Sequence, residues 1–303
     1  MLSFFANIFG YVLQLLYNVV GNYGWAIILF SVLVKAIMIP ISIKQQRTMK
    51  KNQKIQEEVK QIQFKYKNEP EKMNQEMMAL YKREGMSPFS GCLSSIIQIV
   101  LLFSVFLLVR QPLTYMVKMD ADVISKMENV ITEQEEGNKN AYAEIAVIQY
   151  VNNLDNKTSV SKDESFDMKE YAEQANLNMD FFGIDLSQVP KNNWKDFKVL
   201  IIPILYIISS FVSIRLSMNT NNKQNKEKKL ITDGKEQEEE KYNPMDDANK
   251  TMVWMMPIMS VSIAAIAPLG LALYWLMNNI LMIVERLVYN KILNKEEAEN
   301  NAQ

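Results

Sequence analysis

Long apolar runs alternate with strongly charged stretches along the chain. A helix of about 20 apolar residues is long enough to cross the roughly 30 Å hydrocarbon core of a bilayer, and the last of these runs is divided in two by Pro268 and Gly270. The pattern therefore predicts an all-α polytopic membrane protein with five transmembrane helices. The apolar runs lie at residues 24–43, 93–109, 199–214 and 252–284.

The first 22 residues carry no charged side chain. A narrow polar stripe at helical spacing predicts that residues 1–22 form an amphipathic helix in the outer membrane interface. A sixth span that ends at the turn from Gly21 to Gly24 is the alternative. A signal peptide has a basic start and a small-residue cleavage site; neither is clear here, so we expect the helix to stay on the chain. The stripe consists of Ser3, Asn7, Gly10, Gln14 and Asn18.

Residues 44–89 contain eleven basic residues and six glutamates. Loops rich in lysine and arginine stay in the cytoplasm, so we expect the N-terminal side of the first span to be external and the C-terminus of the chain to be cytoplasmic. Two apolar stripes, separated by Asn68, Glu69 and Pro70, predict a helical hairpin with a basic face suited to anionic headgroups or ribosomal RNA. The stripes are Ile55, Val59, Ile62 and Tyr66 in the first arm and Met73, Met77 and Leu80 in the second.

Residues 111–197, here called the acidic segment, hold sixteen acidic residues and eight lysines, a net charge of minus eight. We expect this segment to be external, with partial helical order and no large independent core, because a small domain buries limited surface. Residues 218–250 are almost entirely polar and predict a flexible cytoplasmic linker. The predicted segments are an interfacial helix (1–22), five spans (23–43, 90–110, 198–217, 251–267 and 268–289), the hairpin (44–89), the acidic segment (111–197), the linker (218–250) and a cytoplasmic tail (290–303).

Lys35 stands near the middle of the first apolar run. An ammonium at the centre of a membrane helix costs roughly 2.5 to 3.5 kcal/mol on insertion scales. The first basic residue of the flanking loop, Lys44, lies about 13 Å further along the helix, and a lysine side chain covers only half of that distance. We therefore expect Lys35 to face a wet cavity within the helix bundle. Gln98, in the second span, is a candidate polar neighbour, although interhelical packing is an equally good interpretation of a lone amide.

The composition restricts the chemistry that the chain supports. It contains one cysteine and no histidine, so an internal disulfide is excluded and the usual zinc and haem ligand sets are missing. We expect no metal and no cofactor. The spans also contain neither a pair of aspartates nor a serine beside a base that could activate it, so we expect no enzymatic activity.

Three stretches resemble the YidC-type bacterial membrane insertases, which are relatives of the mitochondrial and chloroplast insertases. The likeness is to the Gram-positive form, which lacks the large periplasmic domain. The first stretch is similar to the first core helix of that family, the second to its cytoplasmic hairpin, and the third to its last helix. They read YGWAIILFSVLVKAIMIPISIKQQRTMKKNQKIQ, KYKNEPEKMNQEMMALYKREGMSPFSGCL and APLGLALYWLMNNI.

The resemblance implies five core helices around a hydrophilic groove that is open to the cytoplasm and to lipid. Carried over to this sequence, the basic centre of the groove falls on Lys35, with Gln98, Ser213 and Trp275 on the other helices. Lysine replaces the usual arginine and keeps the charge but loses the planar fork. Ser94 and Val100 stand where family members often have prolines, and no lipobox cysteine precedes the first helix, which argues against a lipoprotein anchor.

The function implied is that of an insertase and chaperone for integral membrane proteins, with the hairpin receiving the clients. The expected partners are nascent membrane proteins and the lipid bilayer of the bacterial cell membrane. Contacts with the ribosome and with a Sec-type translocon are left open, and we expect a monomer. The alternative is a small transporter or channel with Lys35 as an anion site, but transporters usually contain internal repeats, and none is apparent here.

Overall fold

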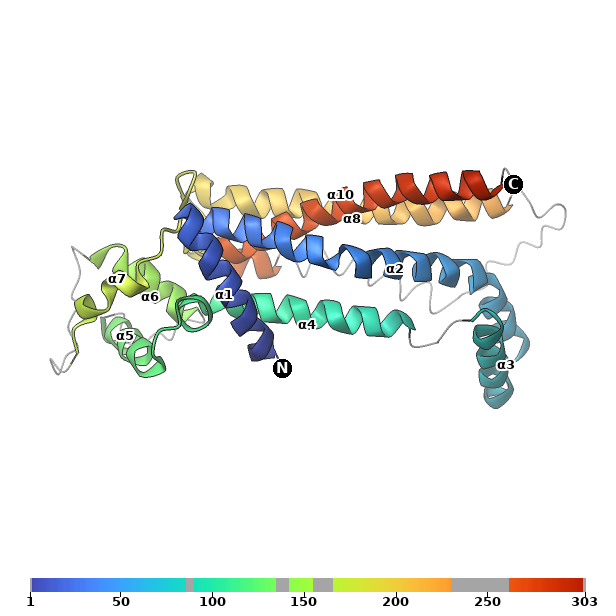
Figure 1. Ribbon diagram of the computed structural model, residues 1–303, viewed down its shortest axis with the longest axis horizontal. Helices are drawn as coiled ribbons and strands as arrows, with labels where there is room; N and C mark the ends of the chain where they lie inside the picture. The colour runs from blue at the N-terminus through green and yellow to red at the C-terminus, as the bar shows by residue number, and fades with distance from the viewer. Residues whose placement is uncertain (1, 86–89, 135–141, 155–165, 230–261, 302–303) are drawn as a thin grey trace.

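The computed structural model describes residues 2–85, 90–134, 142–154, 166–229 and 262–301, which are mainly helical (Figure 1). Four long helices run along the long axis of the molecule, and a fifth, α1, lies obliquely across them. Helix α10 packs against α2, α4 and α8, and α1 packs against α2 and α4. The bounds are Leu2–Val20 for α1, Tyr23–Lys65 for α2, Ser90–Arg110 for α4, Phe197–Lys229 for α8 and Leu269–Asn301 for α10.

Four helices in the described part of the chain are long and apolar enough to cross a bilayer, and the end of α4 is a shorter apolar helix. The prediction of an all-α polytopic membrane protein is confirmed. The span predicted at 251–267 lies largely outside the described residues, as do most of the linker residues. The candidate spans are Leu2–Val20, Tyr23–Thr48, Phe197–Leu216 and Leu269–Tyr289, and the shorter helix is Ile99–Arg110.

Two helices extend beyond the boundaries that hydropathy predicts. Helix α2 does not end at residue 43 but continues to Lys65, and α8 continues to Lys229. Helical hydrogen bonds do not depend on side-chain polarity, so a change from apolar to charged composition does not end a helix. Pro40 lies inside α2, and its ring lacks the N–H that would bond to the carbonyl of Ala36.

The hairpin consists of the second half of α2 and helix α3 (Pro70–Arg83), with Pro70 at the first helical position, where its missing N–H costs least. The apolar stripes of the two arms face each other. Ile55, Val59 and Leu80 are buried, whereas Ile62, Met73 and Met77 are half-buried. An ion pair between Arg83 and Glu58 also joins the arms.

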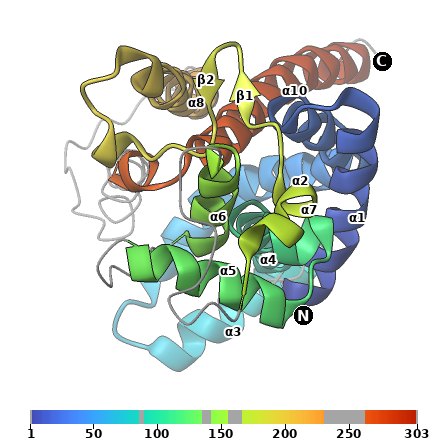
Figure 2. The same ribbon diagram turned by 90° about the vertical axis from the view of Figure 1, so that its left-hand side faces the viewer.

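The acidic segment forms a group of short elements at the end of the long helices opposite α3 (Figures 1 and 2). Its strands β1 and β2 form an antiparallel ribbon in which Phe181 pairs with Ile184. The elements are η1 (Leu113–Val117), α5 (Ala121–Gln134), α6 (Ala143–Val151), η3 (Met168–Glu170), α7 (Ala172–Ala175), β1 (Asp180–Phe181), β2 (Ile184–Asp185) and η4 (Pro190–Asn192).

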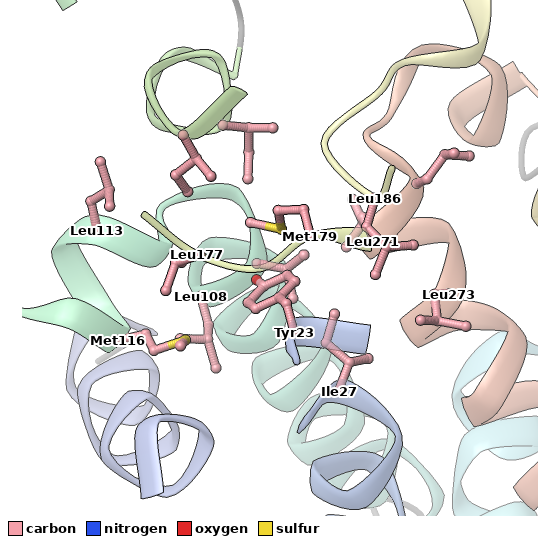
Figure 3. Packing of buried hydrophobic residues seen from close by; sticks show 14 of the residues in the cluster. Tyr23, Ile27, Leu108, Leu113, Met116, Leu177, Met179, Leu186, Leu271 and Leu273 are labelled. Atoms are coloured by element: carbon pink, nitrogen blue, oxygen red, sulfur yellow. The ribbon is translucent and has the colours of Figure 1, made fainter. Parts of the chain in front are cut away.

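The acidic segment shares its hydrophobic core with the long helices. Figure 3 shows the Tyr23 ring of α2 beneath Met179 of the acidic segment, with Leu186 of that segment and Leu271 of α10 to one side. These side chains belong to one continuous cluster of buried residues. The buried apolar residues described in the acidic segment thus belong to the same cluster as those of the bundle.

Backbone hydrogen bonds fix the ribbon to the starts of two long helices. The first N–H groups of a helix have no partner within it. In α10, the N–H groups of Leu269 and Gly270 donate to the carbonyls of Gln188 (2.9 Å) and Leu186 (2.9 Å). At the start of α2, Tyr23 N donates to Asn178 O (3.0 Å). The residues on either side of the ribbon thus provide acceptors for N–H groups at the starts of α2 and α10.

Candidate functional site: a polar cluster between α2, α8 and α10

Lys35 of α2 forms an ion pair with Glu285 of α10. The two side chains are only 19% and 12% exposed, and both residues lie within candidate membrane spans. Removing one partner of a buried ion pair costs about 3 to 5 kcal/mol, because the other charge is left uncompensated. Glu285 therefore offsets much of the cost of placing Lys35 in this apolar helix.

Arg286 extends the cluster to α8. Its Nη1 donates to the backbone oxygen of Ser213 (3.2 Å). Successive helical residues point about 100° apart, so Glu285 and Arg286 reach different neighbours, α2 and α8. Two cations and one carboxylate leave the trio of Lys35, Glu285 and Arg286 with a net charge of plus one.

A second set of polar contacts joins α8 and α10. Asn279 Nδ2 donates to the hydroxyl oxygens of Ser210 (2.8 Å) and Ser209 (3.2 Å). Both hydroxyls donate their own protons to the carbonyl of Tyr206, at 2.9 Å and 2.7 Å respectively. Each serine therefore acts as donor and acceptor at once, which a hydroxyl group allows.

Tyr289 makes another contact between α10 and α2. Its hydroxyl donates to the carbonyl of Ile39 (3.2 Å). Tyr289 follows Glu285 by one helical turn, and Ile39 follows Lys35 by one turn. Because residues four apart share a helix face, the hydrogen bond and the ion pair lie on the same seam between the two helices.

The residues predicted for the site are only partly brought together. Lys35 and Ser213 are connected through Glu285 and Arg286. Trp275 is ten residues from Glu285, about 15 Å along α10, and its ring packs against that of Tyr206 with centroids 5.8 Å apart. Gln98 lies in α4, but its side chain is outside the described part of the structure. That these residues line a groove stays a prediction.

Sequence reasoning missed Glu285 as the partner of Lys35. The available signal was that Glu285 is the only acidic residue between Lys250 and Lys295. A lone carboxylate in one apolar run and a lone ammonium in another are candidates for pairing. As for metals, no group of three or more potential metal ligands of the histidine, cysteine or acidic type was found among the described residues.

Comparison with known proteins places the chain in a family. Residues 15–297 match the family model described as 60Kd inner membrane protein. A protein of Treponema denticola named "Membrane protein insertase YidC" is 27% identical over 285 residues, which cover 94% of this chain and 37% of the relative. Proteins of the same name from Clostridium perfringens and Helicobacter pylori are 45% and 42% identical over 103 and 106 residues.

These two matches cover 34% and 35% of this chain, and 43% and 19% of the respective relatives. The chain thus spans less than half the length of each of these relatives. The family model nevertheless covers nearly all of it, including Lys35, Ser213, Trp275 and Glu285. The chain belongs to the 60Kd inner membrane protein family.

Proposed function

We propose that this chain is a membrane protein insertase. The observation that carries the proposal is the positively charged polar cluster around Lys35, Glu285 and Arg286 within otherwise apolar spans. Buried charge inside a membrane helix is expensive and marks a functional site by default. In a family whose relatives are named insertases, this cluster is the natural place for the polar part of a client.

The insertase would lower the barrier for moving a polar tail across the bilayer. The cluster hosts the tail partway across, so that less of its path runs through hydrocarbon, and the apolar segment that follows then moves into lipid. An isolated pair of opposite charges at 4 Å is worth about 4 kcal/mol at an effective dielectric constant near 20, before desolvation is subtracted. Binding of this strength is transient, and no chemical reaction is catalysed.

The positions of the polar regions support an orientation for the chain. The basic hairpin and the acidic segment lie at opposite ends of the long helices (Figure 1), so they are suited to opposite sides of a membrane. By the distribution of lysine and arginine, the hairpin is cytoplasmic. We further propose that the hairpin receives clients and that the polar stripe of α1 places this helix in the outer interface. We extend the proposal to a monomer in the bacterial cell membrane, with ribosome and Sec-type translocon as further partners.

The proposal is tested by reconstituting the purified full chain in vesicles with a single-span client that carries an acidic N-terminal tail. Insertion is measured as protection of the tail from added protease. We expect insertion with the wild type and with Lys35→Arg, and its loss with Lys35→Ala. Solute release from the same vesicles without insertion of the client would overturn the proposal and favour a transporter or channel.

A further inference from the structure

Glu285 has a role beyond stabilising Lys35. Resting on the function proposed above, we propose that Glu285 is an internal competitor for client carboxylates: it occupies Lys35 in the empty site and must be displaced when an acidic tail binds. Glu285 would thereby determine how strongly the site prefers acidic clients and how quickly it releases them.

The geometry makes binding to Lys35 competitive. The ammonium is already paired with Glu285, and more than four-fifths of each side chain is shielded from solvent. A client carboxylate that joined without displacing Glu285 would place two negative charges side by side, which is unfavourable. A client therefore reaches the full charge of Lys35 only when Glu285 moves away.

Arg286 gives the displaced carboxylate a second partner. It is adjacent to Glu285 in the sequence, and a guanidinium has five N–H donors, of which one reaches the carbonyl of Ser213. When the client takes the place of Glu285 beside Lys35, the positive charge of the adjacent Arg286 means that the displaced carboxylate still has a cation nearby. When the client leaves, Glu285 returns.

This exchange also explains why binding stays weak enough for release. The trio has a net charge of plus one with Glu285 present, and Glu285→Gln would raise it to plus two. The variant should hold an acidic tail longer and release it into the bilayer more slowly. A client whose tail carries asparagine in place of aspartate should respond to the variant less than the acidic client does, because it does not compete for Lys35.

The experiment uses the full chain in vesicles and two clients that differ only in an aspartate-rich or an asparagine-rich tail, each with a photoreactive residue in the tail. Capture and insertion are measured for both clients. With Glu285→Gln, we expect the ratio of acidic to neutral client captured to rise several-fold and insertion of the acidic client to slow. Glu285→Asp, which keeps the carboxylate, should restore the wild-type ratio.

A matched control separates charge competition from structure. The double variant Lys35→Gln/Glu285→Gln keeps the net charge of the trio at plus one but has no ion pair. Its ratio of acidic to neutral client captured should not rise above that of the wild type. Equal loss of both clients in Glu285→Gln, with lower accumulation of the variant, would mean that Glu285 is only structural and would overturn the inference. Failure of the wild type to insert either client would instead refute the proposed function.

Discussion

Gly10 of α1 lies directly against the backbone carbonyl of Tyr115 in η1. A Cβ atom at position 10 would come within 1.8 Å of that oxygen, and a backbone group cannot move aside as a flexible side chain can. Next to this contact, Lys118 Nζ donates to Asn7 Oδ1 of α1 at 2.5 Å. Two residues of the polar stripe of α1 therefore dock on η1.

Gly10→Ala should loosen α1 from the bundle. Alanine is favoured over glycine in a helix interior by about 1 kcal/mol, so helix propensity alone would make the variant more stable. A loss of stability would therefore indicate the steric clash with Tyr115. We expect a lower unfolding temperature in detergent and faster proteolysis within α1. Leu15→Ala, at a position that is 66% exposed, is the control and should behave as the wild type. Equal behaviour of both variants would contradict the contact.

Asn279→Ala should weaken the packing of α8 on α10, because it removes the donor shared by Ser209 and Ser210. Interhelical hydrogen bonds in membrane proteins contribute about 0.6 kcal/mol on average and up to about 1.7 kcal/mol. We expect a loss in this range, measured by unfolding in detergent. Ser209→Ala and Ser210→Ala should each reduce the stability less, because the Asn279 amide can still donate to the remaining hydroxyl. The neighbouring variant Asn278→Ala is the control, and a larger loss from it would contradict the assignment.

Gly24→Ala should displace the ribbon from the start of α2. A methyl group at position 24 would lie 2.4 Å from Cδ2 of Phe181, and that ring is already packed edge-on against Trp25 and Phe182. We expect a lower unfolding temperature for the single variant. In a Phe181→Ala background the same change should cost much less, because the clashing ring is absent. Additive effects in this double-mutant cycle would argue against the contact.

The acidic segment contains a buried carboxylate whose protonation should make stability depend on pH. Glu144 is 3% exposed and accepts hydrogen bonds from Thr114 N (3.0 Å) and Oγ1 (2.6 Å). Burial raises the pKa of Glu144 above its usual value, against the lowering effect of the Thr114 hydrogen bonds, and the nearby Glu128 charge raises it further. Burial raises the pKa of Glu128 as well.

A raised pKa in the folded state means that the native protein binds more protons than the unfolded chain does. The resulting stability is fully present below the unfolded pKa of about 4.3 and is lost as the pH rises through the folded pKa. We expect the unfolding temperature of the wild type to fall as the pH rises above about 4.3. Glu144→Gln, which cannot titrate, should reduce this slope. An unchanged slope would mean that Glu144 is ionised in the native state over this range.

The membrane architecture was predictable because hydropathy reports it directly. The run around Lys35 needs only composition and length to be recognised as a span, and Pro70 marks the start of α3 through the chemistry of proline alone. The continuity of α2 is not predictable from hydropathy, because the change in polarity at Lys44 resembles the end of a span although the helix continues to Lys65. The residues that indicate the end of the helix are Asn68 to Pro70, just after α2 ends and where α3 begins.

The contacts of the site were less predictable because they depend on which helices pack together. Lys35 and Glu285 are 250 residues apart in the chain, and their pairing follows from the packing of α2 on α10. The periodicity of α1 revealed a polar stripe but not that Asn7 and Gly10 meet η1. Helical spacing identifies a face, whereas only the assembled bundle identifies its neighbour.

The length of α2 has a mechanical consequence. Its 43 residues extend over about 65 Å at 1.5 Å per residue, roughly twice the thickness of the hydrocarbon core. The hairpin arm and the Lys35 segment are thus one rod, and force applied at the hairpin reaches Lys35 along the helix itself. Pro40, between the two, removes one hydrogen bond from the helix, so we expect part of any movement at the hairpin to be absorbed there before it reaches the ion pair with Glu285.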